Sequence, residues 1–278
     1  MPYEPRLDRR QLLSGIALAG MGAAALPDTS LAKAAGLSLD TPEANLRALV
    51  RLTASLKEED CPWYYNGTIY ACVGEAQPSP LFTFTGVEIY RMLRVSPTEY
   101  RMIANTITYY RELESQQFLY EFSNPYTGVV NKVTPAAQSS GSAPDSGFEY
   151  SINGVRPSRF RSQFADRPLQ LWWTAVGDYV WLHDSTIYPP GLKAPRMQRK
   201  TNFVRRDQFL DATSDSLPTA FTASVFQPWP TWMQMGDRPG HVVWHASGTK
   251  LKSIDEIPDE HRLRALKDHP ALLTLAGG

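Results

Sequence analysis

The sequence predicts a mainly β protein, in which one large antiparallel sheet curls into a lipocalin-like barrel or half-barrel with an N-terminal helix and a short C-terminal helix. Long stretches rich in β-branched and aromatic residues follow one another from Trp63 to Gly248. Turn sequences rather than helices separate them, which argues against a parallel α/β fold. Because a run of antiparallel strands must protect its edges, closure or strong curling is expected. We expect a single β-barrel-like domain over residues 35–278.

Residues 1–34 have the features of a twin-arginine export signal. Arg9 and Arg10 directly precede the Gly- and Ala-rich apolar run of residues 12–26, which is too short and too weakly hydrophobic for a transmembrane helix. Ala32-Lys33-Ala34 supplies an A-x-A cleavage site. We therefore expect the twin-arginine machinery as a partner, a periplasmic or secreted location, and no stable membrane span after cleavage. A buried N-terminal helix is the alternative interpretation.

The first helix of the mature chain is expected to begin at Pro42. Thr41 is suited to cap it, Pro42 fits the first turn, and Glu43 complements the helix dipole. Apolar residues then recur at helical spacing, at Ala44, Leu46, Leu49, Val50, Leu52 and Leu56.

Strands follow in sequence order. Residues 81–95 and 99–113 form two long strands joined by Ser96-Pro97-Thr98. Gly177-Asp178 is a two-residue hairpin loop. The further strands are expected at residues 118–122, 129–133, 169–176, 179–187, 198–209, 219–228 and 240–248. Residues 135–147 are a surface loop by composition, and residues 257–271 close the chain with a short polar helix.

Composition excludes several classes of function. Lysine plus arginine number 28 and aspartate plus glutamate number 28, so the formal net charge is zero and no nucleic-acid partner is expected. The sequence lacks the usual phosphate-binding, dinucleotide-binding, zinc-protease and α/β-hydrolase motifs, and we expect no cofactor. Cys61 and Cys72 are the only cysteines, and they either pair or stay free.

The segment from Pro228 to Gly236 is expected to be an irregular, rigid connection between two strands. Pro228, Pro230 and Pro239 oppose regular structure around it. The segment carries large apolar side chains, at Trp229, Trp232, Met233 and Met235. These side chains either plug one end of the barrel or form a wall of its pocket, and both interpretations predict that water is excluded.

His183 and Glu88 are the leading catalytic candidates. His183 shares a strand face with Tyr179 and Trp181, where it serves either as a cavity acid or base or as a polar residue at the open end of a barrel. Glu88 lies on the face of Phe84, Tyr90 and Met92. If this face points inward, Glu88 has a raised pKa suited to general acid work.

An outward Glu88 would instead pair with Arg101 or Arg111 across the sheet, and surface statistics for glutamate favour that orientation. Tyr109 is a third catalytic candidate, since the adjacent residues Tyr109 and Tyr110 must face opposite sides of a strand.

The remaining candidates are ligand-binding residues. Trp181, Trp229, Trp232 and Met233 supply an apolar wall, and Arg91 is one of several arginines suited to a substrate carboxylate. His241 and His245 point to the same strand face, but two imidazoles at this spacing are a weak metal signature, so we expect no metal.

Several segments resemble the family known as domain of unknown function 1838. They are NLRALVRLTASL, PWYYNGTIYACVGE, LFTFTGVEIYRML, FSNPYTG, LQLWWTAVGDYVWLHD and PWPTWMQMGDRPGHVVWHASGTKL. Together they extend over roughly residues 45 to 272, with the NPYTG turn and the PWPTWMQMG stretch the most specific. The resemblance implies the extent of the fold and an export signal, and it brings no established reaction.

The sequence favours an exported protein that accommodates a hydrophobic, perhaps aromatic, small molecule and acts on it by cofactor-independent acid/base chemistry, as a lyase, isomerase or hydrolase. A lipocalin-like carrier without turnover and a structural or partner-binding envelope protein are the alternatives.

Overall fold

The structure is a computed structural model that describes residues 39–140, 147–158, 166–187 and 197–275. The predicted export signal of residues 1–34 lies outside the described residues.

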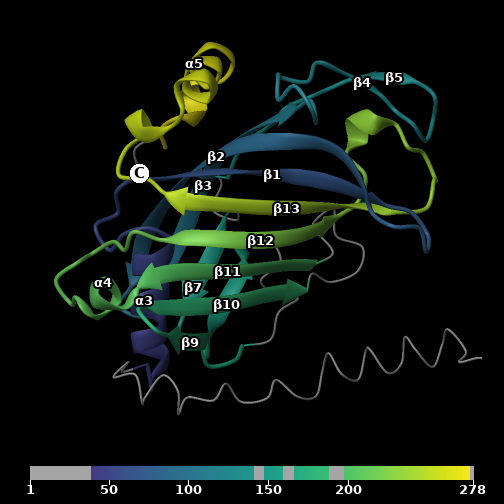
Figure 1. The fold of residues 1–278 in the computed structure, drawn as a ribbon. Coiled ribbons are helices and arrows are strands. Elements are labelled where there is room, and N and C mark those ends of the chain that lie inside the picture. The colour runs from purple at the N-terminus through teal and green to yellow at the C-terminus, as the bar shows by residue number, and fades with distance from the viewer. Residues whose placement is uncertain (1–38, 141–146, 159–165, 188–196, 276–278) are drawn as a thin grey trace, which may run out of the picture.

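One antiparallel sheet, with eleven strands in the described residues, curls into a half-barrel (Figure 1). Its order is β8-β7-β3-β2-β1-β13-β12-β11-β10-β9, and β6 also pairs with β3. The strands are β1 (Cys61–Cys72), β2 (Ser79–Ser96), β3 (Glu99–Arg111), β6 (Ala136–Ser139), β7 (Phe148–Ser151), β8 (Gly154–Pro157), β9 (Trp172–Val176), β10 (Tyr179–Ile187), β11 (Met197–Arg205), β12 (Ala220–Gln227) and β13 (His241–Lys250). A separate hairpin pairs β4 (Glu121–Ser123) with β5 (Val130–Lys132).

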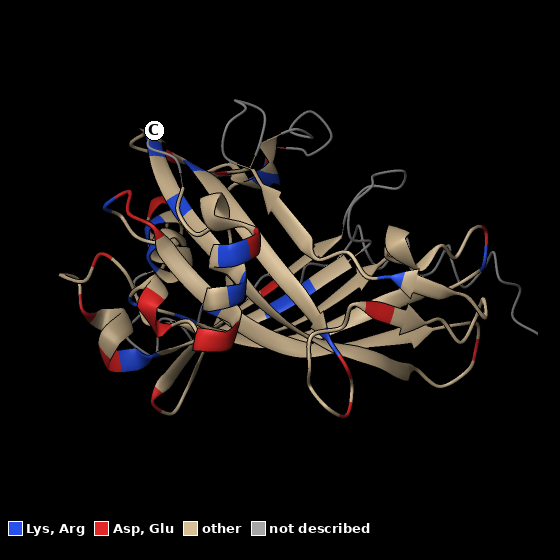
Figure 2. Cartoon of the chain, turned by 90° about the horizontal axis from the view of Figure 1, so that it is seen from above, with Lys and Arg blue, Asp and Glu red and all other residues tan. Residues whose placement is uncertain are grey.

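The helices are α3 (Pro42–Thr53), α4 (Arg206–Leu210) and α5 (Asp259–Asp268), with short 3-10 turns η2 (Thr231–Met233), η3 (Ile254–Glu256) and η4 (Pro270–Leu272). Among the described residues no helix is long and apolar enough to span a membrane. Lys and Arg lie close to Asp and Glu on the helices and loops, while most of the length of the strands consists of uncharged residues (Figure 2).

The predicted mainly β fold is confirmed, including the turn between β2 and β3 and the hairpin loop between β9 and β10. Two details of the prediction were wrong. Ala136–Ser139, expected in a surface loop, form β6 against the middle of β3. The strand expected to continue to residue 209 ends at Arg205, where α4 begins. Cys61 and Cys72 are both free.

Each central strand has one side chain in two on the concave face of the half-barrel. Phe82, Phe84 and Met92 of β2 belong to the two core clusters on this face. Val87 and Ile89 point to the convex face, where they pack with apolar residues of β3, α5 and the C-terminal segment. Because α5 covers this part of the convex face, β2 and β3 are apolar on both sides.

Helix α3 fills one end of the concave face. Its N-terminus forms as predicted, with Thr41 accepting a hydrogen bond from the Ala44 N–H at 3.2 Å and Pro42 in the first turn. Its apolar side chains pack against β2, β3, β7, β9, β10 and β11, in a cluster that includes Leu46, Leu49, Val50, Leu52, Met92, Tyr100, Tyr150, Trp173, Val180, Leu182 and Val204. The helix therefore occupies the end of the half-barrel where β2 finishes and β3 starts.

The opposite end is filled by the connection between β12 and β13, which we call the aromatic loop (residues 228–236; Figure 1). Met233 is fully buried, and the Trp232 ring lies 5.5 Å from Phe82 and 5.4 Å from Tyr110 between ring centroids. Asn124, in the β4–β5 hairpin, donates a hydrogen bond to the Met233 carbonyl at 2.9 Å. These contacts agree with the plug interpretation, and the fully buried Met233 has no surface to offer a ligand.

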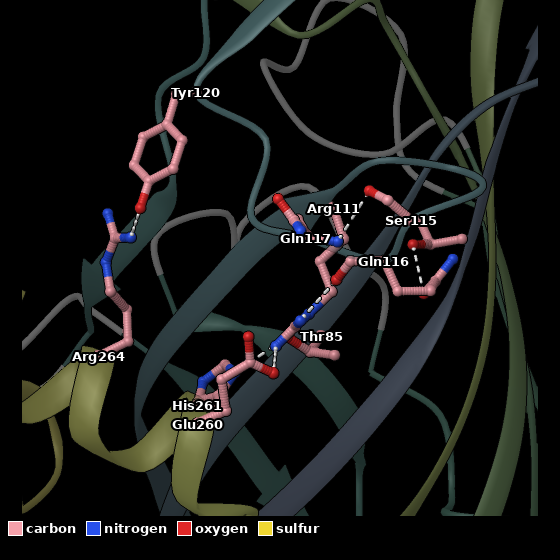
Figure 3. A network of polar contacts seen from close by, with 10 residues as sticks. Thr85, Arg111, Ser115, Gln116, Gln117, Tyr120, Glu260, His261 and Arg264 are labelled. Carbon is pink, nitrogen blue, oxygen red and sulfur yellow. Dashed lines mark hydrogen bonds and ion pairs between the residues drawn. The ribbon is translucent and has the colours of Figure 1, made fainter.

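Helix α5 is attached to the convex face by a polar network (Figure 3). The Arg111 guanidinium donates to Thr85 Oγ1 at 3.2 Å and to the Gln116 carbonyl at 2.7 Å, and it forms an ion pair with Glu260 at 2.9 Å. His261 is completely buried, with Nδ1 3.0 Å from the same Thr85 hydroxyl. The network joins α5 to β2, β3 and the turn after β3.

We predict that Trp232→Ala lowers the free energy of unfolding by about 3 kcal/mol, the lower end of the range for truncation of a core aromatic residue, because Trp232 is partly buried. The substitution removes the contacts that the Trp232 ring makes with Phe82, Tyr110 and Phe122. Urea unfolding measures the change. Trp172→Ala, at a side chain that is 54% exposed, is the matched control and should change stability by less than about 0.5 kcal/mol. Equal effects of the two substitutions would contradict the plug interpretation.

The buried His261 predicts a pH-dependent stability. Burial, followed by the charge of Arg111, lowers its pKa from 6.5 to about 4. Between these values the unfolded chain binds more protons than the folded one, so the free energy of unfolding should fall as pH drops from about 6.5 toward 4, by at most ~3 kcal/mol. Urea unfolding at a series of pH values measures the slope.

Carboxyl groups also titrate in this range, so variants are needed to isolate the histidine. His261→Gln should flatten part of the slope between pH 6.5 and 4, whereas His245→Gln, at an exposed imidazole, is the matched control. An unchanged slope in His261→Gln would show that this imidazole does not contribute.

Candidate ligand-binding site

The middle of the concave face, between α3 and the aromatic loop, is organised by Tyr65. Tyr65 lies between Gly248 of β13 and Gly86 of β2 in the strand register. A Cβ atom at Gly86 would lie 2.2 Å from the tyrosine ring, so only glycine leaves room for it. The ring extends across β2, and its hydroxyl lies 2.8 Å from Thr108 Oγ1 on β3. The two glycines therefore fix where the phenol lies.

Glu88 and Tyr90 form a hydrogen-bonded pair beside it. They lie two residues apart on β2 and face the same side, and the Tyr90 hydroxyl donates to Glu88 Oε2. Both side chains are half-buried, so solvent reaches the concave face here. The outward orientation of Glu88 was wrong, because Arg111 pairs with Glu260 on the other face. Glu88 faces inward with Phe84 and Met92, as the alternative interpretation required.

Lys200 lies on the same concave face, on β11, which β1, β13 and β12 separate from β2 in the sheet. Its ammonium lies 4.3 Å from the ring centroid of Phe221 and 4.9 Å from that of Trp63. Trp63 is directly opposite Glu88 in the register of β1 and β2. The indole ring of Trp63 is therefore a neighbour of both the Lys200 ammonium and the Glu88–Tyr90 pair.

Burial and charge shift the pKa values of these groups away from their values in water. Burial raises the pKa of Glu88, against the opposing effects of the Tyr90 hydrogen bond and Lys200. Burial lowers the pKa of Lys200, against the charges of Glu88 and Asp184. The pKa values of Tyr65 and Tyr90 are raised well above 10, chiefly by burial and then by Glu88. A carboxyl and an amine with opposing shifts are suited to proton transfer.

His183 and Trp181 lie on the convex face and are not brought together with Glu88. They alternate with Val180 and Leu182, which belong to the core cluster around α3. His183 is half-buried beside Trp172, with ring centroids 4.5 Å apart, and burial followed by Arg199 lowers its pKa. The structure therefore assigns the two leading catalytic candidates to opposite faces of the sheet.

Tyr109 and Arg91 also lie on the convex face, whereas Trp229 stays in the aromatic loop, beside the concave core cluster. Tyr109 is buried beneath α5, next to His261. Arg91 forms an ion pair with Asp60 at 2.6 Å and donates to the Leu275 carbonyl at 3.1 Å. Trp229 packs on Tyr126 at 5.6 Å between ring centroids.

His241 and His245 share a face of β13, as the spacing predicts, but alternate with the core residues Val242 and Ala246 and therefore face outward. Across the described residues, no three His, Cys, Asp or Glu side chains come together as a metal site would require.

Sequence reasoning missed Lys200, Tyr65 and Tyr90 as members of the site. Lys200 follows Arg199 in a polar stretch and has the sequence features of a surface residue. The available signal was alternation, since Lys200 is in phase with Asn202 and Val204, both of which are buried. For Tyr65 the signal was the glycine in each neighbouring strand, visible only once the register is known.

The fold and site define a class of protein: an antiparallel half-barrel whose concave face is filled at both ends and carries a polar group in the middle. The chain matches the family model described as protein of unknown function (DUF1838) over residues 58–141 and 200–272. This is more than half of the chain, so the protein belongs to that family, as its sequence motifs predicted.

Two solved structures are similar to the chain. Rv2717c from M. tuberculosis has 12% identity, with 74% of this chain and 95% of that chain covered and a TM-score of 0.27. A DUF1329 family protein from Desulfovibrio piger ATCC 29098 has 13% identity, with 84% and 99% covered and a TM-score of 0.23. Such low similarity carries no argument about the site. No curated protein matches significantly.

Proposed function

We propose that this protein binds a small, mainly apolar or aromatic molecule on its concave face, between α3 and the aromatic loop. One observation carries the proposal: Glu88, Tyr90 and Lys200 are half-buried among aromatic rings, and Tyr90 lies where the two core clusters of the concave face meet. Ligand sites are typically apolar surfaces with a few polar groups that orient the bound molecule. The buried rings of Trp63, Phe84 and Phe221 lie beneath these groups and support them.

Acid/base catalysis is the second candidate, and the Glu88–Tyr90 pair favours it. The raised pKa of Glu88 makes its protonated form more available near neutral pH, and the adjacent phenol can relay or stabilise a proton. His183 has no part in this version of the mechanism, because it lies on the convex face. A carrier would use the same groups only to orient its ligand.

The proposed binding surface predicts that a bulky side chain at position 106 blocks it. Thr106 is half-buried and lies opposite Glu88 in the register of β2 and β3. Thr106→Phe should weaken binding of the neutral fluorescent probe phenylnaphthylamine about 10-fold or more, because the added ring occupies the ligand volume. Fluorescence titration measures the affinity, with thermal unfolding as a check on folding.

Ser247→Phe is the matched control, since Ser247 is exposed on the other face of β13. It should bind the probe as the unsubstituted protein does. Equal binding by both variants would contradict the proposed surface. Native mass spectrometry of the purified protein then identifies a co-purifying molecule, and its conversion by the unsubstituted protein but not by Glu88→Gln would distinguish the enzyme from the carrier.

We further propose that the protein is exported by the twin-arginine route to the periplasm or beyond. Arg9, Arg10 and the Ala32-Lys33-Ala34 cleavage sequence support this proposal. Replacing Arg9 and Arg10 by lysine should leave the uncleaved protein in the cytoplasm, as cell fractionation and immunoblotting would show. Continued export with cleavage would indicate the general secretory route instead.

A further inference from the structure

The ammonium group of Lys200 lies among aromatic rings. In the register of the sheet Lys200 lies beside Ala223 of β12, which is followed by Ala246 of β13 and Gly67 of β1. This row of small residues leaves room for the long lysine side chain above the sheet. The side chain extends toward α3, so that its ammonium lies over Phe221 and Trp63.

The Lys200 ammonium has no hydrogen bond and no ion pair within the described chain. The nearby Lys250 is different, because its ammonium donates to the carbonyls of Arg51 at 2.9 Å and Ala54 at 2.8 Å and to Ser216 Oγ at 3.2 Å. The hydrogen bonds of the Lys250 ammonium therefore stabilise the fold. A desolvated cation is costly unless it is paired and hydrogen-bonded, and aromatic faces supply only part of that stabilisation. The donors of Lys200 remain available to another molecule.

Two carboxyl groups lie near Lys200, that of Glu88 and that of Asp184, which is opposite Lys200 in the register of β10 and β11. Neither makes an ion pair with the ammonium within 4.0 Å, so an anion remains a suitable partner for it. A second cation lies close by, because the Lys250 ammonium is 5.6 Å from the centroid of the same Trp63 ring. Glu88 accepts a hydrogen bond from Tyr90 and makes no ion pair with Lys200 within 4.0 Å. Burial also raises the pKa of Glu88, which favours its uncharged form when an anion binds nearby.

We propose that Lys200 binds the anionic group, a carboxylate or a chemically similar acid, of a ligand whose aromatic or apolar body packs against the half-buried Tyr90 and Thr106. This inference rests on the proposed function and specifies the chemical class of its ligand. A charge-assisted hydrogen bond in an apolar surrounding is stronger than one between neutral groups, so Lys200 determines selectivity for acids.

Two fluorescent probes with the same aromatic skeleton test the inference. Anilinonaphthalene sulfonate carries an anionic group, and phenylnaphthylamine carries none. The unsubstituted protein should bind the sulfonate about 10- to 100-fold more tightly, the range expected for a hydrogen bond to a charged group. Lys200→Met should abolish this preference, because the sulfonate loses its charged partner. Lys252→Met, at an exposed lysine, is the matched control and should keep the preference.

Equal affinity of the unsubstituted protein for the two probes would overturn the inference and leave the proposed function standing. A preference that survives in Lys200→Met, or in Lys200→Gln if the methionine variant does not fold, would also overturn it. Failure of the unsubstituted protein to bind either probe would contradict both the proposed function and this inference. Thr106→Phe must weaken binding of both probes, since otherwise the sulfonate is bound outside the concave face.

Discussion

The C-terminus of α3 ends inside the half-barrel, and the rest of the concave face depends on how its carbonyl groups are hydrogen-bonded. The last carbonyls of a helix have no partners within the helix. Here Lys250 donates to those of Arg51 and Ala54, and the Trp63 indole donates to that of Thr53 at 2.9 Å. Lys250 and Trp63 are neighbours in β13 and β1, so the two central strands hold the helix. The same indole forms the surface on which Lys200 lies, which connects support of the fold to the candidate site.

Most of the architecture followed from local patterns. Proline and glycine turns separate the strands, and Thr41-Pro42-Glu43 begins the helix where it is observed. It was harder to predict which face of each strand points into the half-barrel. Val87, Ile89, Ile103 and Ile107 are apolar because α5 and the C-terminal segment cover them, so β2 and β3 lack the alternation that would identify the inner face. Surface statistics then favoured the wrong side for Glu88, since they do not include the hydrogen bond from Tyr90.

The candidate site was less accessible from sequence than the fold, because it is assembled from strands far apart in the chain. Lys200 and Glu88 are separated by more than a hundred residues, and only the folded sheet brings them near each other, beside Trp63. Tyr65 reaches Thr108 because Gly86, between them, has no side chain. His183 and Trp181 were candidates from the sequence, yet both lie on the convex face. Residue types alone therefore indicated the chemistry of the site only in part.

The sheet begins at β8 and ends at β9, and these two strands are not neighbours in the described sheet. A closed barrel has a circumference fixed by its strand number and stagger. Among the described strands no ring of hydrogen bonds fixes the distance across the concave face, so the bulk of the side chains on that face sets its curvature. The aperture is consequently a property of the residues that fill it, and substitutions among them can change the size of the molecule that fits without altering a single strand pairing.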